Sequence, residues 1–92
     1  MAAIEVRGHG GESIVYDGAT VAKFRHEGKD EAARNPVSTY REVRVTARKR
    51  KGDAEQEYDV LLAMSSIMSL RITESERPRL DELVAALEGG GG

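Results

Sequence analysis

The residues best suited to chemistry in this sequence form a dense run of basic side chains between Tyr40 and Lys51. The segment holds six bases and one acid, Glu42, so its net charge is +5. Guanidinium and ammonium groups bind phosphate and carboxylate oxygens, and such binding weakens as the salt concentration rises. In an extended strand, alternation would place three of the bases on each face. The six candidate binding residues are Arg41, Arg44, Arg48, Lys49, Arg50 and Lys51.

Three kinds of anionic partner would suit this run: an acidic protein surface, a nucleic acid, or the headgroup of an anionic phospholipid. No aromatic residue alternates with the bases, whereas platforms for single-stranded nucleic acid stack bases on aromatic rings. The formal net charge of the chain is −2, and dedicated nucleic-acid domains are usually basic. Residues 52–92 carry nine acids and three bases, so oppositely charged segments can also bring two copies together. We therefore expect a protein partner or self-association, with nucleic-acid or anionic-lipid binding through Arg44–Lys51 as the alternative.

The remaining polar residues do not form a recognisable catalytic motif. Ser13, His26 and Asp17 have the residue types of a hydrolase triad, but no nucleophile-elbow motif surrounds the serine. Asp81 and Glu82 are adjacent carboxylates on the exposed side of a predicted helix, where they serve solvation. The chain contains no cysteine, which excludes disulfides, thiolate metal sites and cysteine nucleophiles. We therefore expect that the protein is not an enzyme.

The glycine-rich segment Gly8–Ser13 (GHGGES) is similar in composition to phosphate-binding loops. Those loops lie between a strand and a helix and usually carry a Lys-Ser/Thr pair, which is absent here. A hairpin turn explains the segment better. His9 and His26 are the only histidines and show no metal-ligand spacing. We therefore expect neither a cofactor nor a metal.

The length of 92 residues predicts one domain, residues 1–88, followed by a glycine tail at residues 89–92. No stretch approaches the roughly 20 apolar residues of a transmembrane helix. Residues 1–8 lack the basic segment and the apolar run of a secretory signal. The expectation is a soluble, cytoplasmic protein. Ten arginines against four lysines, together with eleven alanines, indicate a GC-rich genome.

Alternation of apolar and charged residues predicts strands near the start of the chain. Ile4–Arg7 (IEVR) has the pattern of a half-buried strand. Ser13–Tyr16 and Thr20–His26 flank Asp17-Gly18, a residue pair that tight hairpin turns prefer because glycine accepts positive φ. These segments therefore predict a strand followed by a hairpin.

The next segment, Glu27–Val37 (EGKDEAARNPV), is predicted to be a polar loop. One helical turn at Asp30–Arg34 is compatible with its residues, and Pro36 would end that turn. Strand character resumes over Arg41–Lys49, where Val43 and its alternate neighbours share one face.

Residues 54–72 admit two interpretations. As strands, Tyr58–Met64 and Ile67–Ile72 form a hairpin across Ser65-Ser66. As a helix, Asp53 with Gln56 supplies a cap, and the leucines and methionines fit a helical stripe. The alternation within the second segment favours strands. We expect the hairpin.

The segment Thr73–Glu88 (TESERPRLDELVAALE) is predicted to be an amphipathic helix. Thr73 and Ser75 can both cap its start, and Pro78, which is tolerated only in the first turn, favours Ser75. Gly89 is expected to end the helix. A single helix cannot bury its apolar stripe alone, so we expect it to lie over the sheet. The stripe consists of Leu80, Leu83, Val84 and Leu87.

Several short segments match a known pattern along most of the chain. They are Val6-Arg7-Gly8, Tyr16-Asp17-Gly18, Thr20-Val21, Pro36-Val37-Ser38 with Val43, and Glu76-Arg77-Pro78-Arg79-Leu80 with Leu83. In these segments the chain resembles the small bacterial pleckstrin-homology-like domains that are common in actinobacteria. The resemblance implies a partly open barrel plugged at one end by the helix. It also implies binding of proteins or phosphorylated lipids, and it transfers no catalytic residues.

These elements together predict an α+β fold: an antiparallel sheet or a partly open barrel of about six strands with one C-terminal helix. A helical middle segment would instead give a four-stranded sheet with two helices. The expected function is that of a non-enzymatic protein-interaction module. Its expected contact surfaces are the exposed edge of a strand, the basic patch Arg44–Lys51 and the acidic face of the C-terminal helix.

Overall fold

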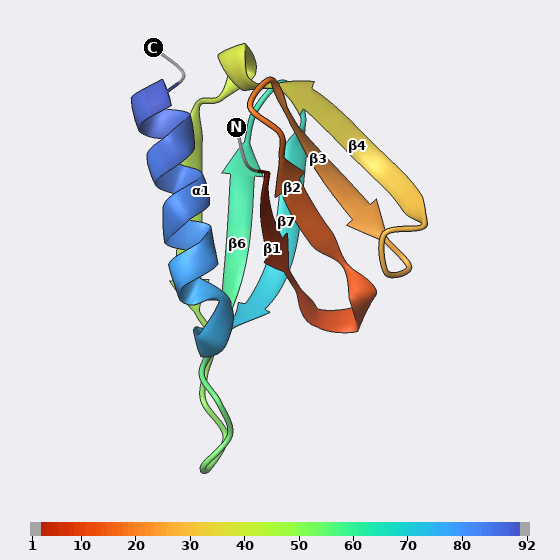
Figure 1. The fold of residues 1–92 in the computed structure, drawn as a ribbon. Helices are drawn as coiled ribbons and strands as arrows, with labels where there is room; N and C mark the ends of the chain where they lie inside the picture. The colour runs from red at the N-terminus through yellow and green to blue at the C-terminus, as the bar shows by residue number, and fades with distance from the viewer. Residues whose placement is uncertain (1–2, 91–92) are drawn as a thin grey trace.

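The computed structural model describes residues 3–90 and has an α+β fold with two antiparallel sheets and one C-terminal helix (Figure 1). The first sheet has the strand order β1-β2-β3-β4 and the second the order β5-β6-β7. The strands are β1 Ile4–Arg7, β2 Ser13–Tyr16, β3 Thr20–Arg25, β4 Asp30–Pro36, β5 Glu42–Ala47, β6 Glu57–Ala63 and β7 Ile67–Thr73. The helical elements are the 3-10 turns η1 His9–Gly11, η2 Val37–Thr39 and η3 Glu74–Glu76, and the helix α1 Arg77–Gly90.

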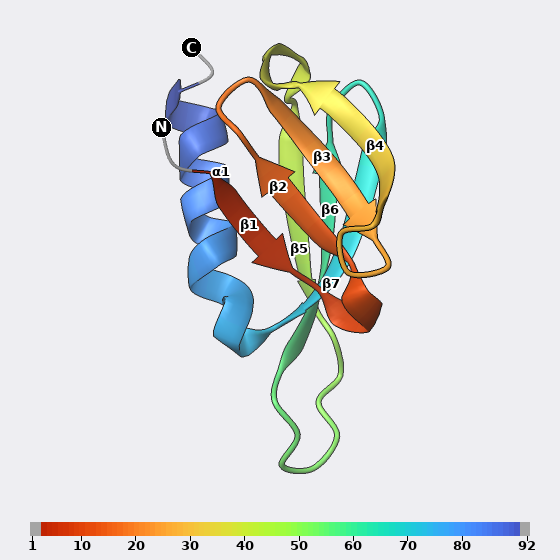
Figure 2. The ribbon, with the colours of Figure 1, turned by 45° about the vertical axis from the view of Figure 1, so that its right-hand side comes forward.

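The α+β class, the antiparallel pairing and the C-terminal helix are confirmed. Residues 3–90 form seven strands, where about six were expected. Their pairings make two separate sheets and do not close into a barrel. The strands of the first sheet run obliquely across those of the second (Figure 2).

The predicted hairpin around Asp17-Gly18 is confirmed as β2 and β3. Asp17 Oδ1 accepts hydrogen bonds from the backbone N–H groups of Ala19 (2.9 Å) and Thr20 (2.7 Å). These two bonds lower the pKa of the Asp17 carboxyl, and the bond from Thr20 has the larger effect. Gly18 has φ 98°, a conformation in which glycine is favoured.

Residues 30–36 form β4, so the prediction of a polar loop with a helical turn is wrong. Asn35 pairs with Val21 of β3. The register shifts between Lys23 and Phe24 of β3, which leaves a bulge in β4. The strand lacks clear apolar alternation because it is an edge strand with most side chains exposed. Asn35 is buried, and its side chain hydrogen-bonds Ser65 and Ser66 in the β6–β7 turn. Pairing with β3, the strand directly before it, therefore defines β4, and Asn35 additionally links it to the β6–β7 turn.

The predicted hairpin across Ser65-Ser66 is confirmed as β6 and β7, with Tyr58 opposite Ile72. The preceding strand, β5, is shorter than the predicted Arg41–Lys49. Between β5 and β6, residues 48–56 project beyond the body of the molecule, and we call this segment the basic arm (Figure 2).

The α-helix begins at Arg77, later than the predicted Thr73, because residues 74–76 form the 3-10 turn η3. Ser75 lies inside that turn and is not the N-cap. Its backbone N–H instead donates to the Glu55 carboxylate (2.7 Å), which comes from the base of the basic arm. The 3-10 turn that precedes the helix is thus held by a residue distant in sequence.

The prediction that Gly89 ends the helix is also wrong, because α1 continues to Gly90. Glycine lowers helix stability by only about 1 kcal/mol per residue, so a helix can extend through it near its end. Gly91 and Gly92 of the predicted tail lie outside the described residues. The predicted apolar stripe faces inward, since its three leucines are buried and Val84 is half-buried.

The core lies between the two sheets and α1. Its buried members are Val6, Ile14, Tyr16, Val21, Val60, Leu62, Met64, Met68, Leu70, Ile72, Leu80, Leu83 and Leu87. Lys23 is also buried, and its Nζ donates to the Ser69 carbonyl (2.7 Å) and lies 3.3 Å from Glu12. This side chain links β3 to β7 and so joins the two sheets. Within residues 3–90, no helix has the length and apolarity needed to cross a membrane.

Candidate interaction surface

The outward face of the second sheet carries exposed side chains from all of its strands. Because side chains alternate along a strand, one residue in two points away from the core. The register aligns these residues in rows across the sheet. One row is Arg44, Leu61 and Ser69, and the next is Thr46, Asp59 and Arg71.

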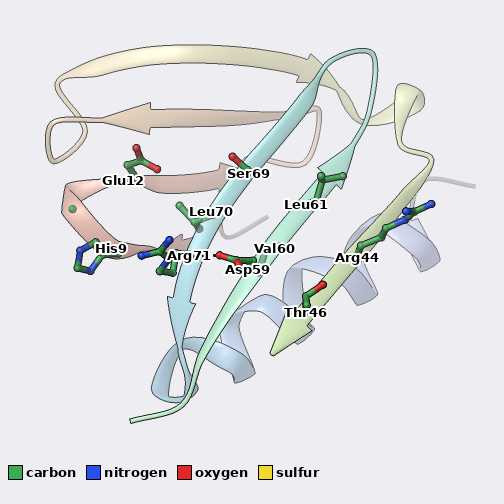
Figure 3. A pocket seen from close by; sticks show the side chains of 11 residues that line it. His9, Glu12, Arg44, Thr46, Asp59, Val60, Leu61, Ser69, Leu70 and Arg71 are labelled. Carbon is green, nitrogen blue, oxygen red and sulfur yellow. Dashed lines mark ion pairs between the residues drawn. The ribbon is translucent and has the colours of Figure 1, made fainter. Parts of the chain in front are cut away.

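A shallow groove of about 570 Å³ crosses this face. His9 and Glu12 line it on the side of the β1–β2 loop, and Arg44 and Thr46 line it on the β5 side (Figure 3). Leu61, which is 37% exposed, adds an apolar contact area. The groove combines an apolar floor with charges of both signs.

Arg71 is the residue of this surface that the sequence did not reveal. Its side chain lines the groove and also a second hollow at the base of the basic arm. The Nε atom is buried and makes no hydrogen bond among residues 3–90, although Asp59 Oδ1 lies 3.5 Å away. Sequence alternation in β7 places Arg71 on the outward face, but its position beside the arm depends on the pairing of β6 with β7.

The six predicted basic residues do not form one patch. The structure brings four of them together with Arg71 around a hollow of about 400 Å³, which also contains two acids, Glu55 and Glu57. Arg44 lines the other groove, and Arg41 precedes β5 and lines neither hollow. The four grouped residues are Arg48, Lys49, Arg50 and Lys51.

Two of the grouped bases already contact partners within the chain. Arg48 Nη1 lies 2.9 Å from Asp59 Oδ2 and donates a hydrogen bond to it. Arg50 Nε donates to the Ala54 carbonyl (2.8 Å) within the arm. Asp59 therefore partly neutralises Arg48, and the bond to Ala54 holds the Arg50 side chain against the arm.

The acidic helix face is also weaker than expected. Arg77 lies 3.4 Å from Asp81, and Arg79 lies 3.6 Å from Glu82, so arginines on the same helix partly neutralise both acids. Glu88 accepts a hydrogen bond from the Tyr40 hydroxyl (3.1 Å). Paired acids attract a basic partner less strongly than unpaired ones.

The clearest open feature is the outer edge of β5. Arg48 N–H donates to the Glu57 carbonyl (2.9 Å), directly opposite it on β6. Because hydrogen-bonded pairs alternate in an antiparallel ladder, the even-numbered residues of β5 bond toward β6. Val43, Val45 and Ala47 therefore direct their N–H and C=O groups away from the sheet. In the described part of the chain, no strand pairs with this edge.

The other three sheet edges are covered or blocked. α1 lies beside β1 (Figure 2), and the Glu76 carboxylate accepts the Arg7 N–H (3.5 Å). At the β7 edge, Gly8 packs against Leu70, and the Ser69 carbonyl accepts the Lys23 ammonium. β4 carries a bulge and ends with Pro36. These are the usual devices that prevent strand addition.

The shifted pKa values belong to groups outside both hollows. Burial, with a further contribution from Glu88, raises the pKa of Tyr40. The hydrogen bond to Glu74 raises the pKa of Tyr58. Arg34 lowers the pKa of Glu31, chiefly through its hydrogen bonds to that carboxylate. The tyrosine shifts arise from contacts between structural elements, whereas the Glu31 shift arises from a contact within β4.

The other residues considered for chemistry have structural positions. Ser13 is buried in β2, and Asp17 accepts the turn hydrogen bonds described above. His26 is exposed in the β3–β4 turn with φ 54°. Among residues 3–90, no group of three His, Cys, Asp or Glu side chains is placed to hold a metal ion.

No protein-family model, curated protein or solved structure matches this chain.

Proposed function

We propose that this protein is a non-enzymatic protein-interaction module whose partner adds an extended segment to the outer edge of β5. The observation that carries the proposal is the contrast among the four sheet edges. Three are covered or blocked, whereas β5 presents the backbone groups of Val43, Val45 and Ala47 without a paired strand among residues 3–90. Strand addition at an open edge supplies affinity through backbone hydrogen bonds and specificity through alternate side chains.

The side chains of β5 define the partner segment. On the inner side, Val43 and Val45 are half-buried and pack against the core, so they favour apolar partner residues. On the outer side, Arg44 and Arg48, the residue that follows β5, favour acidic partner residues opposite them. The partner segment is therefore an extended strand with apolar side chains on one face and at least one acidic side chain on the other.

We also propose that the chain is a pleckstrin-homology-like domain. The order of four antiparallel strands, three antiparallel strands and a C-terminal helix supports this assignment. The proposal agrees with a role in binding, because many domains of that fold bind other molecules and do not catalyse reactions.

A second candidate function is binding of a nucleic acid or an anionic phospholipid by the basic arm. The observation in its favour is the hollow where Arg71 joins residues 48–51. The acids that line the hollow, together with the arm's internal contacts, reduce the free positive charge, so we rank this function second.

Selection of displayed peptides against the purified protein tests the preferred function. Peptides that bind should protect the amides of Val43, Val45 and Ala47 from hydrogen exchange. The substitution V45P removes an outward N–H, whereas V45A retains it, so V45P should abolish binding and V45A should largely preserve it. Equal binding to both variants would overturn the proposal. Loss of binding on K49E/K51E with V45P unaffected would support the basic arm instead.

A further inference from the structure

We propose that the segment accepted by β5 is β5 of a second copy of the same chain, which makes a two-fold symmetric dimer. This inference rests on the proposed function, because it requires the β5 edge to be the interaction surface. Two antiparallel β5 strands would join the three-stranded sheets of both copies into one continuous sheet. The partner is chosen by the charges along β5 and at its end, which are self-complementary in one register.

Backbone geometry restricts the registers available to such a dimer. Only odd-numbered residues of β5 direct hydrogen-bonding groups outward, so odd residues must pair with odd residues. A register centred on Val45 places Val45 opposite Val45 of the second copy, and Val43 opposite Ala47. Each of these hydrogen-bonded pairs supplies two N–H···O bonds. The apolar side chains of both copies then lie on the inner face.

The same register makes the outward charges complementary. It places Glu42 opposite Arg48 of the second copy, and the two-fold axis repeats this pair at the other end. Arg44 falls opposite Thr46, which is neutral. Opposite charges that face each other across strands are stabilising, whereas like charges are destabilising.

The neighbouring registers are worse. Moving the centre by one residue toward the N-terminus places Arg44 opposite Arg44 of the second copy. Moving it by one residue toward the C-terminus places Arg44 opposite Arg48 and shortens the paired stretch. Each shift therefore replaces an attractive contact with a repulsive one.

The contacts within one copy permit this pairing. Glu42 lies 3.1 Å from Arg44, and the side chains are 53% and 71% exposed, so their ion pair is weak and can rearrange. Arg48 contacts Asp59 and would lie between Asp59 and Glu42 of the second copy. Arg41 would also lie opposite Lys49 of the second copy. These two like charges, which flank β5 as Arg48 does, oppose part of the attraction between Glu42 and Arg48.

Sedimentation velocity of the purified chain is the first test. Because the chain has a mass of 10.0 kDa, a dimer sediments as a species of about twice that mass. Dimer should appear between about 10 μM and 1 mM protein, the range of weak association. E42R and R48E should each weaken dimerisation by about tenfold or more, because each replaces two attractive contacts by two repulsive ones.

Mixing those two variants tests the register directly. In the mixed dimer, the arginine introduced by E42R meets the glutamate introduced by R48E, and the unchanged Arg48 of the first copy meets the unchanged Glu42 of the second. Association should therefore return when E42R and R48E are combined. Circular dichroism and thermal melting confirm that each variant is folded. If the mixture stays monomeric although both variants are folded, the proposed register is wrong.

Cysteine cross-linking provides an independent test, because the natural chain has no cysteine. R44C and T46C change exposed residues that face each other in the proposed dimer. A mixture of the two should form a disulfide-linked dimer under mild oxidation, whereas each variant alone should form far less. Equal cross-linking in all three samples would overturn the register.

These outcomes separate the two proposals. If the chain remains monomeric at 1 mM while selected peptides still protect the β5 amides, the dimer is refuted and the interaction module stands. If neither self-association nor peptide binding involves β5, both proposals fail.

Discussion

The edge strands β4 and β5 differ in how they meet solvent. β4 contains a bulge, ends with proline and carries an exposed cluster of charges. β5 has a regular register with β6 over its whole length and has no proline. The features of β4 therefore prevent a further strand from pairing with it, whereas β5 keeps the regular backbone that strand addition needs.

Pro36 is placed where it prevents strand addition at the edge of β4. Val37 N–H donates to the Ala19 carbonyl (2.9 Å), so the adjacent Pro36 has its nitrogen on the free side of β4. Proline has no N–H, and an edge position is where a sheet accepts it. At the equivalent free side of β5, Val45 retains its N–H. A single backbone N–H, absent at Pro36 and present at Val45, therefore helps to decide whether a further strand can pair with the edge.

The largest expected effect is a difference between prolines on the two sides of β5. T46P removes an N–H that bonds toward β6 and leaves its acceptor on β6 without a hydrogen bond. We expect it to lower the free energy of unfolding by about 3 kcal/mol, the upper end of the range for leaving a buried polar group unpaired. V45P removes a free N–H and should cost about 1 kcal/mol, mainly through lost side-chain burial. Urea titration measures both. Equal losses would mean that the outward edge is not free.

The second prediction concerns the closed edge of β7. A Cβ atom on Gly8 would lie 2.6 Å from Leu70 Cγ and 2.9 Å from the Arg71 carbonyl oxygen. G8A should therefore lower the free energy of unfolding by about 1–3 kcal/mol, the range for overpacking. G89A is the matched control, because no atom lies within 4 Å of its added Cβ. It should stabilise by up to about 1 kcal/mol. A stable G8A variant would contradict the close packing at this edge.

The third prediction concerns the removal of proline from the edge of β4. P36V restores an outward N–H and should lower the free energy of unfolding by about 0.4–1 kcal/mol, because the unfolded chain gains freedom. The bulge and the charges remain, so we expect no increase in self-association by sedimentation. A dimer formed by P36V would show that proline alone closes this edge.

The smallest effect is the pH dependence of the charges around β4. Arg34 lies 2.7 Å from Glu31 and 3.4 Å from Asp17, and the pKa values of both acids are lowered in the folded protein. Both acids therefore stabilise the fold above their unfolded pKa values, near 4.5 for Glu31 and 3.8 for Asp17, and this stability is lost as pH falls through the folded values. Urea midpoints should decline with acidification, and D17N and E31Q should each reduce that decline. An unchanged slope in D17N would contradict a role for its charge.

Prediction from sequence worked where local pattern and burial agree. The Asp17-Gly18 hairpin follows from a turn preference and is confirmed. The hairpin across Ser65-Ser66 follows from alternation, although leucine and methionine favour helix. The inward stripe of the helix follows from its period, and Leu80, Leu83 and Leu87 are buried.

Prediction failed where a distant segment supplies the decisive contact. The pattern of β4 does not indicate a strand, because most of its side chains are exposed and its buried residue, Asn35, is polar and hydrogen-bonds serines about thirty residues away. The predicted start of the helix is too early because residues 74–76 form a 3-10 turn, and Glu55, which is distant in sequence, accepts the N–H of Ser75 in that turn. Arg71 was overlooked because its proximity to the basic arm arises from strand pairing.

The sequence by itself determined most of the strands, the C-terminal helix and the charges along β5, because alternation, turn residues and side-chain types are local properties. Only the tertiary structure decided that the edges of β1 and β7 are closed while that of β5 stays open. Each of those two edges closes because a separate segment comes to lie against it: α1 at β1, and Gly8 and Lys23 at β7. No local pattern records such an approach, since it depends on how the two sheets pack around their common core.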